Sequence, residues 1–322
     1  MIVGILVAII LALSFILYKA SDSLIHAIHT LSGKTIFSVF FLASIFTGIA
    51  TTVPELFIGI SSAYGGNPEF GFGNAIGSNI ANIALILPIA VFVSGMVLNI
   101  RQAHFSRQTI LILLSASLFP FLLGADGVLS RADGAFLLFL YGVYAVYIFN
   151  KRPTGVYGFK NVLSRIVVNF EDRNVLKATT FAILSTILML FAAHFLLKSS
   201  LLLAQTLGIQ SFIIALFIVA PGTSLPELFV AMISIRKKEI DVLYGDIFGS
   251  LVSNANLVVG ITALIQPIRI SVFSNYSLSI AALIVTFSLF FIFSFTKKRF
   301  DKWEAAVLLG IYILFFLAET FV

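Results

Sequence analysis

Hydrophobic runs long enough to cross a bilayer recur along the sequence, and they limit its possible folds more than any other feature. An α-helix of about 20 residues crosses a hydrocarbon core of about 30 Å. Barrel strands would need alternating polar and apolar residues, which these runs lack. We therefore predict an all-α membrane protein with ten transmembrane helices, at about 1–18, 36–64, 72–97, 107–125, 132–150, 176–198, 209–235, 242–267, 275–296 and 302–321.

Composition and charge agree with this class. Hydrophobic residues make up 60% of the sequence, charged residues 11%, and the mean hydropathy is +1.09, outside the range of soluble domains. A net charge of +6 would suit a nucleic-acid partner, but the basic residues follow the predicted topology. All of the 20 Lys and Arg residues except Arg131, Lys198 and Arg269 fall in odd-numbered loops between the predicted helices. Because basic residues are enriched in cytoplasmic loops, we predict a multi-pass cell-membrane protein with both termini outside and no nucleic-acid partner.

The first hydrophobic segment could also be read as a cleaved signal sequence. It lacks a basic n-region and a small-x-small cleavage site, so we predict that it is retained as a helix. The sequence contains no cysteine, which excludes disulfides, thiolate metal ligands and a thiol nucleophile.

The two halves of the sequence resemble each other at one constant spacing, the repeat offset, which aligns residue 51 with residue 223. Without gaps, TTVPELFIGISSAYGGNPEFGFGNAIGSNIAN (51–82) aligns with TSLPELFVAMISIRKKEIDVLYGDIFGSLVSN (223–254), and ten of 32 positions are identical. Eight of the ten identities fall on polar or helix-breaking residues, which a shared hydrophobic composition would not select. Each half holds five predicted helices, so the second half enters the membrane in the opposite orientation. We predict two five-helix inverted-topology repeats, at 1–150 and 176–322, joined by a cytoplasmic linker at 151–175.

Each repeat places a proline beside a glutamate inside a hydrophobic run, at Pro54–Glu55 and Pro226–Glu227. Proline removes a helical hydrogen bond, and an ionised glutamate in the membrane is costly unless it is paired, protonated or bound to a cation. A kink and a protonated hydrogen-bond donor are the simpler readings of either residue alone. Their joint occurrence in both repeats favours a dianionic pocket near the middle of the bilayer. Hydroxyl groups one turn earlier would line it, from Thr51, Thr52, Thr223 and Ser224.

The third and eighth predicted helices supply further oxygen-bearing side chains. Every fourth position is polar, which gives each helix a polar stripe, formed by Asn74, Ser78 and Asn82 in one and by Asp246, Ser250 and Asn254 in the other. Gly73 and Gly77, like Gly245 and Gly249, form small-xxx-small pairs that allow close helix contact. Carboxylate, hydroxyl, amide and carbonyl oxygens without sulfur or imidazole suit hard cations such as Ca²⁺ and Na⁺.

At these residues the sequence resembles the calcium:cation antiporter superfamily, particularly prokaryotic sodium/calcium exchangers with ten helices in two inverted repeats. The motifs are GTSLPEL at 222–228 and GNAIGSNIAN at 73–82. The resemblance implies that Glu55 and Glu227 are shared by calcium and sodium, and that helices 1 and 6 slide across the other eight. It implies further metal ligands from the side chains of Thr51, Thr52, Ser78, Asn82, Thr223, Ser224, Ser250 and Asn254, and from the backbone oxygens of Gly48 and Ala220.

The sequence departs from the family pattern at several of these positions. The first repeat reads ATT where the family usually reads GTS, and Pro221 adds a second proline beside the other motif. Leu251 replaces the asparagine of GSN, and Asp246 replaces the asparagine of GN. Some prokaryotic relatives carry an acid at the position of Asn254. Asp246 is thus an additional candidate ligand, with packing around the ligands as its alternative role, and it leaves the counter-ion open.

We predict a secondary active antiporter that exchanges Ca²⁺ for Na⁺ by alternating access. The alternative is a Ca²⁺/H⁺ antiporter that uses the same carboxylates. An intramembrane hydrolase is a third possibility, but the sequence has no HExxH motif and no histidine is duplicated between the repeats. The predicted protein is therefore not an enzyme and has no cofactor. Its predicted partners are the transported ions and the lipid bilayer, with no obligate protein partner evident.

Overall fold

The computed structural model describes residues 2–34, 37–66, 68–95, 98–99, 107–150, 173–206, 224–270, 277–296 and 299–321. The first half contains α1 (Ile2–Lys34), α2 (Val39–Leu42), α3 (Gly48–Tyr64), α4 (Pro68–Ala81), α5 (Leu87–Ser94), α6 (Arg107–Ala116), α7 (Phe119–Leu123) and α8 (Arg131–Asn150). The second half contains α10 (Arg173–Thr206), α13 (Leu225–Lys237), α14 (Ile240–Val252), α15 (Val259–Ile265), α16 (Ser277–Thr296) and α17 (Lys302–Phe321).

Within these ranges, three π-helical turns connect shorter helices into longer helical segments. They are η1 (Ala43–Thr47) between α2 and α3, η2 (Asn82–Ile86) between α4 and α5, and η6 (Ser253–Val258) between α14 and α15. A 3₁₀ turn, η4 (Gly124–Asp126), follows α7. Single π turns inside α-helices are frequent at functional sites, because they shift the backbone out of its regular pairing.

The described helices confirm the predicted helical membrane class. Six helical segments within the described ranges are long and apolar enough to cross a membrane, and α6 with α7 makes a seventh if that bent pair counts as one span. Helix α16 is apolar over a shorter stretch, Leu278–Ser294. The helix predicted at 209–235 is described only from Ser224 onward, and most of the predicted linker lies outside the described residues.

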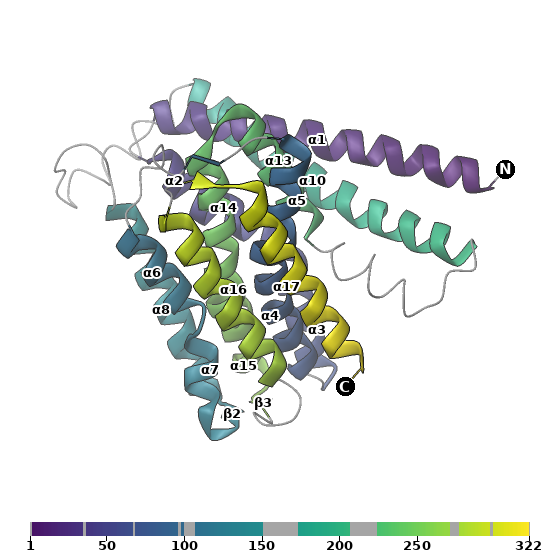
Figure 1. Cartoon of the computed structure of the whole chain (residues 1–322). Helices are drawn as coiled ribbons and strands as arrows, with labels where there is room; N and C mark the ends of the chain where they lie inside the picture. Colours follow the sequence, from purple (N-terminus) through teal and green to yellow (C-terminus); the bar gives the residue numbers. More distant parts are fainter. Residues whose placement is uncertain are drawn as a thin grey trace.

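Most helices run side by side in one bundle, whereas α1 and α10 pack along each other and are steeply inclined to the rest (Figure 1). The pair contacts the bundle chiefly through α13. The outer faces of the pair carry exposed apolar side chains, including Leu11 (65% exposed), Phe15 (61%) and Phe191 (57%). Such a surface is expected of helices that face lipid.

Helix α1 is longer than the sequence predicted. It continues to Lys34 rather than ending near residue 18, so Lys19 and Lys34 belong to a helix and not to a loop. The reason is an apolar stripe at helical spacing, with Leu17, Leu24 and Ile28 buried against side chains of α10 and α13. Helix α10 likewise begins at Arg173, inside the predicted linker, and continues to Thr206.

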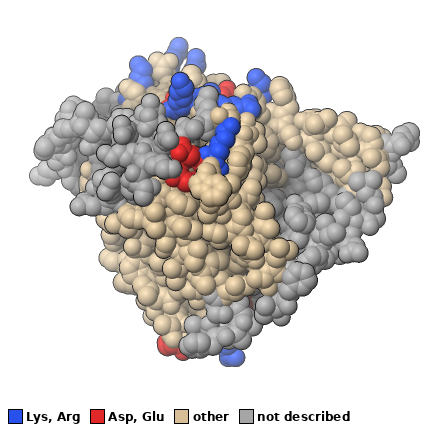
Figure 2. All heavy atoms as spheres, viewed as in Figure 1, with Lys and Arg blue, Asp and Glu red and all other residues tan. Residues whose placement is uncertain are grey.

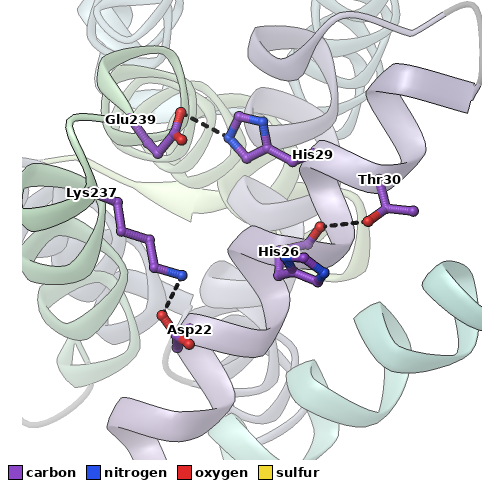
Figure 3. Close-up of polar contacts among 6 residues, drawn as sticks. All are labelled: Asp22, His26, His29, Thr30, Lys237 and Glu239. Carbon is purple, nitrogen blue, oxygen red and sulfur yellow. Dashed lines mark hydrogen bonds and ion pairs between the residues drawn. The ribbon is translucent and has the colours of Figure 1, made fainter.

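Two polar side-chain contacts hold the C-terminal half of α1 against the turn between α13 and α14 (Figure 3). Asp22 pairs with Lys237 at the end of α13, and His29 Nε2 lies 2.8 Å from Glu239 Oε2. The intervening residue, Lys238, ends α13 in a left-handed conformation with φ of 61°. All four side chains are between 31% and 38% exposed, so water and salt reach these pairs.

On the face shown in Figure 2, basic side chains gather mainly at one end of the molecule, where β4 (Arg299–Phe300) lies in Figure 1. The described surface below that end on the same face is mostly uncharged, as a surface in contact with lipid requires. The distribution agrees with the charge asymmetry read from the sequence.

Short antiparallel ribbons join the two halves of the chain. Strand β1 (Leu98–Asn99) pairs with β4, and β2 (Val128–Leu129) pairs with β3 (Ile268–Arg269). These very short strands were not predicted, because a run so short has no periodicity in the sequence.

Candidate ion-binding site

Glu55 is buried inside the bundle, in the middle of α3 and directly after Pro54. Its Oε1 accepts a hydrogen bond from Ser78 Oγ on α4 at 3.2 Å, whereas Oε2 has no partner among the described residues. Because Pro54 has no N–H, the carbonyl of Ala50 one turn earlier lacks its usual helical donor. The local sequence thus places a buried acid near a backbone carbonyl that has lost its usual N–H donor.

Glu227 is the corresponding acid of the second half, and it lies in the first turn of α13. Ser224 is the N-cap residue, and Pro226 stands where a missing N–H costs little. The positive end of the helix dipole favours a carboxylate at this position. Both Glu227 and Ser224 are buried, and among the described residues neither side chain makes a hydrogen bond of good geometry, although the Thr51 hydroxyl is near enough to interact with the Glu227 carboxyl. The charged neighbours of Glu227 are Glu55 and Asp246, so the acids of the two halves lie near each other.

Hydroxyl groups connect α3 of the first half with α14 of the second. Thr51 Oγ1 lies 2.9 Å from Ser250 Oγ and 3.5 Å from both Asp246 Oδ1 and the Gly48 carbonyl oxygen. Thr52 Oγ1 donates to the same Gly48 carbonyl at 2.6 Å. The second carboxylate oxygen of Asp246 is buried and has no partner in the described part of the chain. Oxygen atoms from helices of the two halves therefore meet around Thr51.

Two buried asparagines lie where the backbone hydrogen bonding changes from α-helical to π-helical. Asn82 is the first residue of η2 and Asn254 the second of η6, and the repeat offset relates these positions. The two amides differ in their contacts. Asn254 Nδ2 donates to Asn79 Oδ1 at 3.2 Å, whereas neither amide atom of Asn82 has a partner among the described residues.

Glycines allow the helices that carry these groups to approach each other. A Cβ on Gly48 would lie 2.7 Å from the Gly249 Cα, and one on Gly249 would overlap the Ser44 backbone. Gly245 similarly faces Ala43 and the Phe40 carbonyl. The small-xxx-small contact predicted for the second half is therefore present. The corresponding role of Gly77 stays a prediction, because its counterpart contact would involve the segment around Ala220, which is not described.

The structure describes all but two of the predicted ligands. Thr223 and Ala220 lie outside the described residues, and the other eleven are buried: Gly48, Thr51, Thr52, Glu55, Ser78, Asn82, Ser224, Glu227, Asp246, Ser250 and Asn254. Sequence reasoning missed Asn79, which is buried between the two halves of the chain and contacts both Leu251 and Asn254. It stands in the GSN motif, but only the fold shows what it contacts.

The site has the chemistry of a hard-cation site. Its donors are carboxylate, hydroxyl, amide and carbonyl oxygens, and no cationic side chain among the described residues pairs with Glu55, Glu227 or Asp246. No three described His, Cys, Asp or Glu side chains form a compact metal-binding group. Any bound ion would therefore depend on neutral oxygens as well as on the acids, a donor set that suits Ca²⁺ or Na⁺.

A family model described as sodium/calcium exchanger protein matches residues 5–150 and 177–321. The chain belongs to the sodium/calcium exchanger family. This membership confirms the resemblance seen at the repeat motifs, and because related family members are exchangers and antiporters, it also confirms that the protein is not an enzyme.

Relatives of this exchanger-family chain occur in bacteria and archaea. It is 30% identical to inner membrane protein YrbG of Escherichia coli, covering 68% of this chain and 67% of the relative. It is 26% identical to the sodium/calcium exchanger MaX1 of Methanosarcina acetivorans, covering 93% and 94%. Its fold matches a solved structure of the sodium-calcium exchanger NCX_Mj with a TM-score of 0.80 and 23% identity, over 97% of this chain and 98% of that one.

Proposed function

We propose that the protein is a secondary active antiporter that exchanges Ca²⁺ for Na⁺ across the cell membrane by alternating access. The observation that carries the proposal is the pair of buried glutamates, Glu55 and Glu227, one from each half and each without a cationic partner among the described residues. Two carboxylates balance the charge of one Ca²⁺. The same oxygens can bind Na⁺ in its place, so the two ions compete for the site.

The proposed ligands extend from these acids to the neighbouring oxygens. Ser78, Thr51 and Ser250 would complete the shell from the sides of α4, α3 and α14. Asn82, Asn254, Thr52, Ser224 and the Gly48 carbonyl lie on the same elements or next to them. Thr223 and Ala220 are proposed by analogy between the repeats, since the repeat offset relates them to Thr51 and Gly48. The ions are transported substrates, and we propose no cofactor.

We also propose ten membrane-crossing segments arranged as inverted repeats at 1–150 and 176–322. The ribbons support this arrangement. Shifting the pair Leu98–Phe300 by the repeat offset leads close to the pair Val128–Arg269, and the two ribbons lie toward opposite ends of the molecule. The π turns η2 and η6 are related by the same shift. Equivalent features at opposite ends are what an inverted duplication produces.

The proposed orientation places both termini outside and residues 151–175 in the cytoplasm. Because the natural sequence contains no cysteine, single cysteines report on topology without background. In intact cells we expect Thr154→Cys to be shielded from an impermeant maleimide and Ala132→Cys, at the start of α8, to react with it. Permeabilised cells, in which both should react, provide the control. The reverse labelling pattern would overturn the orientation.

The counter-ion decides between sodium and proton exchange. The test uses purified protein in liposomes, with ⁴⁵Ca²⁺ outside and the pH equal on both sides and held by a protonophore. We expect calcium uptake when sodium is loaded inside and none when choline replaces it. Uptake driven by a pH gradient without sodium would establish the alternative, Ca²⁺/H⁺ antiport. Absence of uptake under both gradients would refute the proposed function.

Asp246 is expected to affect sodium more than calcium. Its carboxyl group is the third acid of the proposed site and contacts Thr51. Asp246→Asn therefore keeps the two glutamates that balance Ca²⁺ but removes the acid that would favour an additional Na⁺. We expect calcium binding to persist while half-maximal exchange requires more sodium. Asp241→Asn, in the first turn of the same helix, is the matched control. An unchanged sodium dependence would show that Asp246 has only a packing role.

A further inference from the structure

Asn79 links the two halves beside the proposed site. Its side chain is fully buried (0% exposed), and its Nδ2 donates to the Leu251 carbonyl at 3.0 Å. Its Oδ1 accepts the hydrogen bond from Asn254 Nδ2 at 3.2 Å. The remaining amide atom, Asn254 Oδ1, is buried and has no partner within the described residues.

The direction of this chain of hydrogen bonds is determined by its first member. A backbone carbonyl can only accept, so Asn79 must turn its NH₂ group toward Leu251 and its oxygen toward Asn254. Only the NH₂ group of Asn254 can donate to that oxygen. The Asn254 carbonyl oxygen is thereby left free, and it is the amide atom that binds cations.

The related positions of the other half lack the amide partner that Asn79 provides for Asn254. Residue 251 is the counterpart of Asn79 at the repeat offset, and Asn82 is the counterpart of Asn254. Position 251 is leucine, which has no group to orient an amide. In agreement, neither amide atom of Asn82 has a partner among the described residues. The Asn254 amide is therefore held by a hydrogen bond to Asn79, whereas the Asn82 amide has no such bond to a described residue.

We propose that Asn79 is a positioning residue that holds the Asn254 oxygen toward the transported cation, and that Leu251 leaves Asn82 without the equivalent support. The inference rests on the proposed function, because Asn254 must be an ion ligand for its orientation to matter. Asn79 itself does not contact the ion. It acts as the outer partners of metal ligands do, by determining which atom of the ligand faces the metal.

The test compares Asn79→Leu, Leu251→Asn and the double variant that carries both changes. Calcium binding to purified protein is measured with ⁴⁵Ca²⁺, and the KM and kcat of exchange are measured in liposomes. For Asn79→Leu we expect the calcium Kd and KM to rise about tenfold or more, with a much smaller change in kcat. Leu251→Asn should lower the Kd, because it supplies the partner that Asn82 lacks.

The double variant exchanges the asparagine at position 79 with the leucine at position 251. The amide partner then lies beside Asn82 instead of Asn254, and the two residue types at this contact stay the same. We expect the double variant to bind calcium more tightly than Asn79→Leu alone, which a purely structural role of Asn79 would not produce. An unchanged Kd in Asn79→Leu, or a double variant no better than that single variant, would overturn the proposal. If Asn79→Leu does not fold, Leu251→Asn decides alone, and an unchanged Kd there would overturn it. Failure of the wild-type protein to bind or transport calcium would instead refute the proposed function.

Discussion

Replacing either glutamate of the pair, as Glu55→Gln or Glu227→Gln, is expected to abolish calcium exchange. Each change keeps the side-chain shape but removes one of the two charges that balance a divalent ion in a buried site. Removing one partner of a buried charge interaction costs roughly 3–5 kcal/mol, or more than a hundredfold in affinity. Calcium uptake into sodium-loaded liposomes measures the loss. Glu69→Gln, in the first turn of α4, is the matched control.

The same variants should remain folded. A carboxylate without a bound ion is costly to bury, so its amide is expected to leave the thermal unfolding temperature of the ion-free protein unchanged or higher. Calcium should raise that temperature in the wild type and not in the variants, because only an ion that binds the folded state stabilises it. Exchange near the wild-type rate in either variant would place the ion site elsewhere.

The second large effect is expected from Gly249→Val. A side chain at this position would overlap the backbone of Ser44 in η1, so α14 would have to separate from η1 and from α3, which follows it. Overpacking of this kind typically costs about 1–3 kcal/mol, and here it would also move Ser250 away from Thr51. We therefore expect both a lower unfolding temperature and loss of exchange.

The matched control for this change is Gly142→Val in α8. Gly142 is exposed, and a Cβ there meets no described atom within 4 Å. We expect near-normal exchange from this variant. Normal exchange from Gly249→Val would mean that the close approach of the two helices is not needed for ion binding.

The sequence predicted those parts of the site that depend on residue type. Glutamate is rare in membrane helices, so its duplication beside a proline, at Glu55 and Glu227, was visible without a structure. The burial of the predicted ligands also follows from residue type, because oxygen-bearing side chains avoid lipid. Asn79 was missed since an asparagine in a helix has many possible partners, and only packing of the halves brings it to Leu251.

Helix boundaries were less predictable than helix positions. Lys19 was predicted to lie in a loop after the first hydrophobic run, but the structure continues α1 through it and through Asp22. A charged residue does not end a helix; it only requires a polar environment, which Lys237 provides for Asp22. The glycines predicted that helices would pack closely, but they did not predict which helices. A small residue indicates a close contact and carries no information about the segment on its other side.

The inclined pair of helices α1 and α10 has exposed apolar faces, so its contacts differ in how strongly they would resist displacement of the pair relative to the bundle. Lipid tails are as apolar as leucine, so exchanging a protein contact for a lipid contact along Leu11 or Phe15 changes the free energy little. The contacts of Asp22 with Lys237 and of His29 with Glu239 are different, since hydrocarbon cannot replace them. Both contacts are partly exposed, and the ion pair between Asp22 and Lys237 is therefore screened by salt. Displacement of the pair should accordingly respond more to the ionic strength at that membrane face than to the length of the lipid chains.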